Sequence, residues 1–253
     1  MCDRAHFFVV VPFYNEEKGI DATLAALAAQ DDPDFTLILV DNGSTDSSRS
    51  MVGDFAARTA RPNVVLIDEK QKGTGAASDT GFRFAISSGA KWIARTDADC
   101  LPARNWVRAL KAAMCEEGLE FVAGKIKPRE DELALGHTRR VLLELMVLVA
   151  ERFGRIHRRG PQFKYPYFMA AGNNLGISAA LYERSGGFPR SSIEVLHEDR
   201  ALSETVRTLT TRAAVRTNIV VYNSVRRVRA YGYVNTLRWY RNHGYRGGVV
   251  DVR

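Results

Sequence analysis

Short apolar runs alternate with helical patterns along the N-terminal part of the chain. Four runs rich in apolar and β-branched residues are predicted to be buried strands: Phe7–Val11, Phe35–Val40, Asn63–Ile67 and Lys91–Ala94. Between them, apolar residues recur every three or four positions, which indicates amphipathic helices. These residues are Ile20, Leu24, Leu27 and Ala28, then Met51, Val52 and Phe55, then Phe82, Ala85 and Ile86. The alternation predicts an α/β fold with a Rossmann-like, mostly parallel central sheet flanked by helices.

The second half of the chain continues the alternation less regularly. A helix is predicted around Arg104–Cys115, a short strand at Phe121–Ala123, and a strongly apolar helix over Leu133–Phe153. The chain shows no internal repeat and no low-complexity linker. We therefore expect one continuous domain over residues 1–210, followed by a C-terminal extension over 211–253.

Composition and the lengths of the apolar runs limit the class of protein. With 45% hydrophobic and 26% charged residues among 253, the chain is predicted to be globular. Its three cysteines are an odd number without metal-ligand spacing, so we expect no disulfide framework. The opening apolar run is too short for a secretion signal, and Val141–Ala150 is about half the roughly 20 residues of a spanning helix. We expect a cytoplasmic protein, at most bound to the inner face of the membrane.

The positive charge is concentrated at the C-terminal end. From Arg207 onward there are ten Arg, no Lys and one acidic residue, against a net charge of +7 for the whole chain. Aromatic residues lie between the arginines: Tyr231, Tyr233, Trp239, Tyr240 and Tyr245. This pattern suits a peripheral contact with anionic lipid or with a lipid-linked phosphate, and equally a basic contact between subunits of an oligomer. Nucleic acid, which the same residue types also suit, is the least favoured partner.

Polar residues follow three of the predicted strands. Pro12–Glu17 follows the first, Asp41–Asp46 the second and Asp97–Asp99 the fourth. In an open parallel sheet, ligands bind beyond the carboxyl ends of the strands. We therefore expect these three segments to meet in one site.

Asp97 and Asp99 are candidate ligands of a divalent cation. Two residues apart after a strand, both carboxylates can face one ligand, and their hard oxygens suit Mg²⁺ or Mn²⁺. Such a pair leaves positions on the metal for phosphate oxygens. The alternative interpretation is a solvated acidic turn.

The other strand ends carry candidate nucleotide contacts. Asp41 suits a base or ribose, Tyr14 can stack on a base, and Glu16 can bind ribose hydroxyls. As alternatives, Asp41 starts an Asx-turn and Glu16 complements a helix dipole. Lys72 and Gly73 precede a predicted helix, where backbone N–H groups and an amine approach phosphate or base.

Asp199 is the candidate general base. It follows Glu198 and precedes a helical pattern over Arg200–Leu209, and a carboxylate at a helix N-terminus stays ionised at neutral pH. The alternative interpretation is a plain helix N-cap.

Taken together, these blocks resemble the family 2 glycosyltransferases. The blocks, in the family's order, are Val11–Glu17, Val40–Asp46, Asp97–Asp99, Gly186–Phe188 and Glu198–Asp199. The match covers about residues 7–210. The resemblance implies the GT-A fold, with a nucleotide-binding part over about 1–100 and an acceptor part over about 101–210. It also implies Mn²⁺ or Mg²⁺, a nucleoside-diphosphate sugar donor, UDP by family weight, and inversion at the anomeric carbon.

The resemblance assigns expected roles to individual residues. The catalytic residues are Asp199 as base and Glu198 beside it, and the metal ligands are Asp97 and Asp99. The loop where donor sugar and acceptor meet is Gly172, Asn173 and Asn174. The nucleotide-binding residues are Pro12, Phe13, Tyr14, Asn15, Glu16, Asp41, Gly43, Lys72, Gly73, Asp97 and Ala98. A lipid-linked, small-molecule or protein acceptor, in the setting of cell-envelope polysaccharide, fits these roles.

Three departures from the family pattern and two rival functions are left open. Asp79 stands where many members have Asn, and Ser178 where many have Arg. Asn235–Trp239 is a degenerate form of the Gln-x-x-Arg-Trp element of processive synthases, which favours single-sugar transfer. A sugar nucleotidyltransferase is disfavoured because its Gly-rich, Arg-containing loop is missing. Asp99 and Asp199 argue against a non-catalytic nucleotide-sugar-binding protein.

Overall fold

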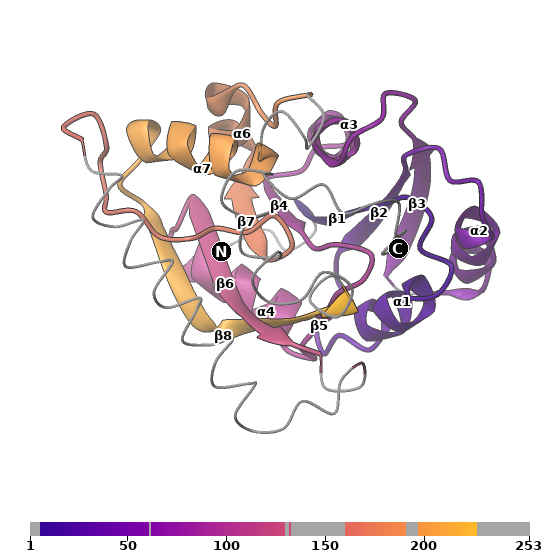
Figure 1. Cartoon of the computed structure of the whole chain (residues 1–253). Helices are drawn as coiled ribbons and strands as arrows, with labels where there is room; N and C mark the ends of the chain where they lie inside the picture. Colours follow the sequence, from indigo (N-terminus) through magenta and orange to yellow (C-terminus); the bar gives the residue numbers. More distant parts are fainter. Residues whose placement is uncertain (1–5, 61, 130–131, 133–159, 191–196, 227–253) are drawn as a thin grey trace.

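The computed structural model describes residues 6–60, 62–129, 132, 160–190 and 197–226, which form one sheet with helices on both faces (Figure 1). The strands are β1 Phe7–Phe13, β2 Thr36–Asp41, β3 Asn63–Asp68, β4 Trp92–Arg95, β5 Leu101–Pro102, β6 Phe121–Pro128, β7 Leu175–Ser178 and β8 Ala213–Asn223. The helices are α1 Ile20–Ala28, α2 Ser48–Arg58, α3 Thr74–Ser87, α4 Trp106–Lys111, the π-helix η2 Ala112–Glu116, α6 Ala179–Ser185 and α7 Glu198–Leu209. The sheet order is β3-β2-β1-β4-β7-β6-β8-β5.

The first four strands form the parallel half of the sheet, which confirms the four strands predicted from sequence. β1 pairs in parallel with β2 and with β4, and β2 pairs in parallel with β3. The register places Phe13 beside Asp41 and Asp41 beside Asp68. The carboxyl ends of these three strands are therefore level.

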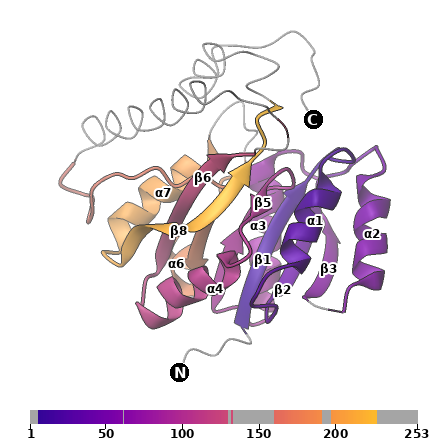
Figure 2. The same cartoon turned by 90° about the horizontal axis from the view of Figure 1, so that it is seen from below.

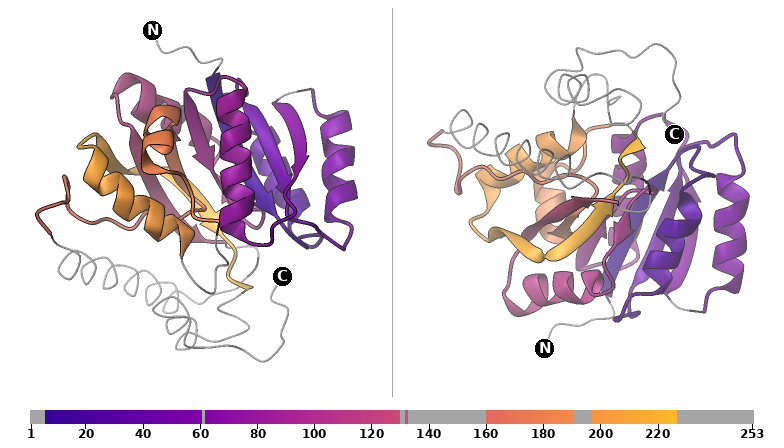
Figure 3. Two further views of the ribbon diagram at one scale, coloured as in Figure 1. Left: turned by 90° about the horizontal axis from the view of Figure 1, so that it is seen from above. Right: turned by 60° about the horizontal axis from the view of Figure 1, so that its bottom comes forward.

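Alternation along β1 divides the core into two layers. Phe7, Val9 and Val11 pack with α1, α2 and α4 on one face, the face turned toward the viewer in Figure 2. Phe8 and Val10 pack with α3, α6 and α7 on the other, which is in front in the left view of Figure 3. Both faces of the strand are buried, as expected for a strand inside a parallel sheet.

The second half of the sheet has mixed directions. β7 is antiparallel to both β4 and β6, whereas β8 runs parallel to β6 and antiparallel to β5. The sequence predicts that the domain ends at residue 210. β8 follows that boundary in the chain and belongs to the same sheet. Residues 213–223 therefore complete the sheet rather than forming part of an appendage.

Several expectations fall outside the described residues or need correction. The apolar stretch Leu133–Phe153, the Asn235–Trp239 element and the chain from residue 227 onward lie outside them. Within the described residues, no helix has the length and apolar character to cross a membrane. Cys100 is buried and free, whereas Cys115 takes part in a disulfide bond. The sequence predicts no disulfide framework, and the bond at Cys115 is one that it does not foresee.

Candidate functional site

The loops that follow β1 and β2 are joined by side chain to backbone hydrogen bonds. Asn15 adopts a left-handed backbone conformation, with φ of 51°. Its N–H donates to Ser44 Oγ at 3.1 Å, and its Oδ1 accepts from the N–H of Thr45 at 2.8 Å. The two strand ends therefore form one connected surface, as the sequence predicts.

Asp41 is engaged within the protein. Its buried carboxylate accepts from the N–H of Ser44 at 2.8 Å, which is the Asx-turn alternative, and from Arg49 Nη1 at 3.1 Å. Arg49 also bonds to Asp68 at the end of β3. A contact between Asp41 and a nucleoside stays a prediction, and it would add to an existing ion pair.

Lys72 brings together several residues expected to bind the nucleotide. Its Nζ donates to the carbonyls of Asn42 and Gly43, both at 2.9 Å, and lies 3.9 Å from the centroid of the Tyr14 ring. The N–H of Gly73 donates to Asn42 Oδ1 at 2.8 Å. An aromatic face, an amine and a glycine turn thus meet beyond β1 and β2.

Three of the residues predicted to bind the nucleotide have buried side chains. Pro12 and Phe13 lie within β1 and are buried, and Ala98 is 4% exposed. The carbonyl of Ala98 accepts from Thr23 Oγ1 on α1 at 2.7 Å. The side chains of Phe13 and Ala98 belong to the hydrophobic core, so a nucleotide contact of these residues stays a prediction.

A buried arginine lies among the acidic candidates. Arg95, the last residue of β4, is 1% exposed. Its Nη2 lies 3.0 Å from Asp97 Oδ1 and 3.3 Å from Glu198 Oε1. The Arg95 guanidinium therefore joins the predicted metal ligand Asp97 to the segment that carries the predicted base. Sequence reasoning missed Arg95, although a charged residue ending an otherwise apolar strand was the available signal.

Asp97 and Asp99 are both partly exposed, and their role as ligands of one cation stays a prediction. Their side chains are 34% and 30% exposed. Among the described residues, no group of three or more His, Cys, Asp or Glu could hold a metal ion. Two partly exposed carboxylates suit Mg²⁺ or Mn²⁺ when phosphate oxygens and water complete the coordination. Each of the two carboxylates also lies near a guanidinium, Asp97 at 3.0 Å from Arg95 and Asp99 at 3.6 Å from Arg226.

Asp199 is not the N-cap of its helix. The N-cap of α7 is His197, and Asp199 lies in the first turn. Its Oδ2 accepts from the N–H of Gly172 at 3.0 Å, and its Oδ1 from the N–H of Arg200 at 2.7 Å. Burial raises the pKa of Asp199 above its ordinary value, against the lowering effects of the Gly172 hydrogen bond and of Arg95. Burial raises the pKa of Glu198 in the same way, again opposed by Arg95.

The two asparagines of the loop Gly172–Asn174 differ in their contacts. Asn174 is 1% exposed, and its side chain bonds to Trp106 Nε1 at 2.9 Å and to the carbonyls of Lys125 and Ile219. Asn173 Oδ1 is buried without a hydrogen-bond partner among the described residues. An unpaired acceptor near the predicted base can accept a hydrogen bond from a ligand or from water. Of the two asparagines, Asn173 is therefore the candidate for substrate.

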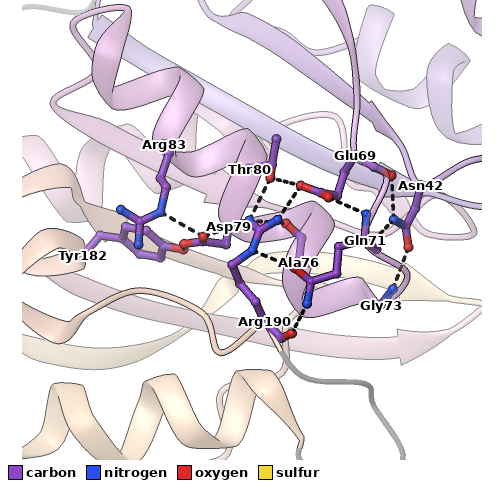
Figure 4. Close-up of polar contacts among 10 residues, drawn as sticks. All are labelled: Asn42, Glu69, Gln71, Gly73, Ala76, Asp79, Thr80, Arg83, Tyr182 and Arg190. Carbon is purple, nitrogen blue, oxygen red and sulfur yellow. Dashed lines mark hydrogen bonds and ion pairs between the residues drawn. The ribbon is translucent and has the colours of Figure 1, made fainter.

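The two departures from the family pattern have structural partners. Ser178 accepts from the N–H of Leu181 at 3.2 Å and so caps α6. Asp79 is buried and accepts from Arg83 Nε at 2.8 Å, Tyr182 Oη at 2.9 Å and Arg190 Nη1 at 3.1 Å (Figure 4). Two guanidinium groups therefore meet at the Asp79 side chain.

Arg190 extends this contact to the loop between β3 and α3. Its Nη2 donates to Glu69 Oε2 at 2.7 Å and its Nε to Gln71 Oε1 at 3.1 Å (Figure 4). Asn42 accepts from Gly73 and donates to the carbonyls of Glu69 and Gln71, so the same network reaches the Lys72 turn. Arg190 therefore links the segment leading toward α7 to the predicted nucleotide loop.

Replacing Arg190 with Met is expected to weaken nucleotide binding several-fold. The change removes charge-assisted hydrogen bonds worth about 1.5–3 kcal/mol each before compensation, and it frees the Glu69–Gly73 loop. Arg83→Met is the matched control, because Arg83 also bonds to Asp79 but not to that loop. Calorimetric titration with a nucleoside diphosphate should show a weaker Kd for Arg190→Met alone. Equal losses of nucleotide affinity in both variants would mean that Arg190 only stabilises the fold.

Comparison with known proteins places this geometry in context. The family model "Glycosyl transferase family 2" matches residues 8–184. Glycosyltransferase AglE of Haloferax volcanii is 34% identical over 47% of this chain and 38% of its own length. An undecaprenyl-phosphate 4-deoxy-4-formamido-L-arabinose transferase of Aeromonas hydrophila is 32% identical over 49% of this chain and 37% of its own. The chain thus spans less than half the length of these relatives.

Solved structures share the fold over most of the chain. S. aureus TarS 1–349, in complex with UDP-GlcNAc, has a TM-score of 0.64 at 18% identity, over 86% of this chain and 58% of that one. Mannosyltransferase PcManGT of Pyrobaculum calidifontis, in complex with GDP-Man and Mn²⁺, has a TM-score of 0.63 at 21% identity, over 92% and 64%. The expected GT-A arrangement is confirmed by these likenesses.

Proposed function

The chain belongs to glycosyl transferase family 2, and on that premise we propose that it is an inverting transferase that moves a sugar from a nucleoside-diphosphate sugar to an acceptor hydroxyl. The observation that carries the proposal is the meeting of carboxylates from two distant segments at one buried guanidinium. Arg95 contacts Asp97 on one side and Glu198 on the other, with Asp199 adjacent. The donor end and the acceptor end of a displacement would meet there.

In this proposal the nucleoside lies beyond β1 and β2. Tyr14 offers a ring face beside Lys72, and the Gly73 turn provides backbone N–H groups at the start of α3. The names of similar structures include both UDP and GDP sugars. UDP remains the donor we propose, from the weight of the family.

Asp199 would act as the general base. Its raised pKa makes it a better proton acceptor than an exposed aspartate, while its N–H donors from Gly172 and Arg200 fix its direction. The acceptor oxygen, losing its proton to Asp199, attacks the anomeric carbon from the face opposite the departing diphosphate. Asp97 and Asp99 would hold Mn²⁺ or Mg²⁺, which supplies positive charge to the leaving diphosphate.

For the acceptor we propose a lipid-linked molecule. Relatives carry names such as UDP-Glc:alpha-D-GlcNAc-diphosphoundecaprenol beta-1,3-glucosyltransferase, from Escherichia coli. The arginines of the sequence from Arg227 onward would hold the protein at an anionic membrane surface. A small-molecule or protein acceptor would not need that surface.

The proposed function is tested by the thermal midpoint of unfolding with UDP, GDP, TDP and their common sugars, each with Mn²⁺ or EDTA. A ligand that binds only the folded state raises the midpoint by mass action. We expect a metal-dependent rise with one nucleotide and, with a matching sugar donor, release of that diphosphate. Binding without release or transfer would support a non-catalytic binding protein instead.

Asp99→Asn is expected to abolish the metal-dependent part of that rise. The amide keeps the size of the side chain but removes the charge that attracts a divalent cation. Asp54→Asn on α2 is the matched control, since Asp54 is an exposed aspartate away from the strand ends. A rise with Mn²⁺ that is equal in both variants would contradict the metal role of Asp99.

A further inference from the structure

The C-terminal end of the described chain reaches into the predicted metal site. After β8, whose end lies beside the start of α1 in Figure 1, Arg226 directs its guanidinium back across the sheet edge. Its Nη2 lies 2.6 Å from Glu16 Oε2 and 3.6 Å from Asp99 Oδ2. The Arg226 guanidinium thus faces both Glu16, predicted to bind ribose, and Asp99, predicted to bind the metal ion.

The position of Arg226 is supported by residues that follow β6 and β8. Ser224 Oγ accepts from Arg226 Nε at 3.1 Å and donates to Glu132 Oε2 at 2.6 Å, and Glu132 also accepts from the N–H of Val225 at 2.9 Å. Arg129 bonds to Glu132 and to the carbonyl of Asp99. The Arg226 side chain is 24% exposed, which leaves a path from these carboxylates to a ligand.

A divalent cation on Asp99 and a guanidinium near the same carboxylate repel each other. At about 4 Å, two like unit charges interact by about 1 kcal/mol in water and about 4 kcal/mol at the effective dielectric of a protein surface, and a divalent ion doubles this. A bound diphosphate would offset this repulsion, because its negative charge attracts both the metal ion and the Arg226 guanidinium. Arg226 is therefore electrostatically favourable when a metal ion and a diphosphate are both bound, and unfavourable when the metal ion is bound alone.

We propose that Arg226 neutralises Glu16 and Asp99 when the site holds no donor, and contacts the diphosphate of the donor when the metal binds. The inference rests on the proposed function, since it needs a nucleoside diphosphate in this site. It makes the segment after β8 part of donor recognition. Arg226 becomes a second positive charge for the leaving diphosphate, and it makes metal binding dependent on nucleotide.

The test compares Arg226→Met with the parent chain and with Arg216→Met. Arg216 lies on β8, ahead of Arg226 in the chain, and pairs with Glu117, so its loss removes the same charge away from the site. Mn²⁺ binding without nucleotide is measured from the magnetic resonance signal of the free ion. Nucleoside diphosphate binding with Mn²⁺ is measured by calorimetry, using whichever of UDP, GDP or TDP binds the parent, with the corresponding nucleoside as a phosphate-free probe.

For Arg226→Met we expect Mn²⁺ alone to bind about fivefold more tightly because a competing cation is gone. The nucleoside diphosphate should bind about tenfold more weakly because a charge-assisted contact is lost, and the nucleoside should bind as in the parent. Arg216→Met should change none of these constants. Arg226→Lys, which keeps the charge, should stay near the parent in Mn²⁺ binding and guards against a misfolded Met variant.

Two results would overturn the proposal. Mn²⁺ and diphosphate constants within twofold of the parent in Arg226→Met would make Arg226 a surface ion pair only. Tighter Mn²⁺ binding with unchanged diphosphate binding would remove the contact with the donor. Failure of the proposed function looks different, because the parent itself would then bind no nucleoside diphosphate.

Discussion

Asp199→Asn is expected to lower turnover by about a thousandfold or more, within the range that general bases contribute, while leaving donor binding intact. The amide cannot take the proton of the acceptor hydroxyl, yet it can still accept the hydrogen bond that Gly172 donates to Asp199 in the parent. Initial rates and a calorimetric donor Kd measure the two effects separately. Glu198→Gln is the comparison, because Glu198 is paired with Arg95 and should act through structure.

The pH dependence gives an independent check on Asp199. Burial raises its pKa, so kcat/KM in the parent should begin to fall, as pH decreases, at a higher pH than for an ordinary aspartate. The same raised pKa means that the folded state binds this proton more tightly than the unfolded state does. The ionised group therefore costs stability above its folded pKa, and that cost is lost as pH falls through it. Asp199→Asn should have an equal or higher thermal midpoint at neutral pH, and near-normal turnover in this variant would move the base elsewhere.

Arg95→Met is expected to cost about 3–5 kcal/mol of the free energy of unfolding, because removing one partner of a buried ion pair leaves a charge uncompensated. The side chains of Arg95 and Glu198 are only 2% and 8% exposed. The variant should also raise the pKa values of Glu198 and Asp199 further, since Arg95 lowers both. The fall of kcat/KM at low pH should then begin at a higher pH than in the parent.

Arg207→Met separates these two consequences. Arg207 is equally buried, but its contacts include the carbonyl of Tyr165 and the ring of Phe163, 3.9 Å from its Cζ. It should lower stability without moving the pH profile. Arg95→Lys, measured by the same chemical denaturation and pH series, keeps the charge and should recover part of both losses. An unmoved profile in Arg95→Met would mean that Arg95 is a structural residue only.

The sequence could predict the parallel half of the sheet because its information is local. β1, β2 and β4 are apolar runs buried on both faces, β3 at the edge of the sheet is an apolar run that is half-buried, and polar residues mark their carboxyl ends. Asp97, Asp99 and Asp199 were candidates for the same reason, since each belongs to a short block with a recognisable order. The structure brings these blocks to one end of the sheet, and their roles there remain predictions.

The arginines that organise the site could not be predicted in this way. Arg95 meets Glu198 across 103 positions, Arg190 meets Asp79 across 111, and Arg226 meets Glu16 across 210. No local period encodes such pairs, because each depends on how loops from distant strands turn at the sheet edge. The same is true of Asn174, which the motif order placed among the substrate contacts and whose side chain holds β6 and β8 together.

The short strand β5 has a consequence for how the protein is made. It begins two residues after Asp99 and pairs only with β8 among the described strands, through Leu101 with Tyr222 and Pro102 with Val221. On the ribosome, the acidic turn therefore emerges more than a hundred residues before the strand that holds it in place. Such distant pairing is slow to form. A nascent chain that ends before residue 213 would carry Glu198 and Asp199 and still lack the strand that β5 pairs with.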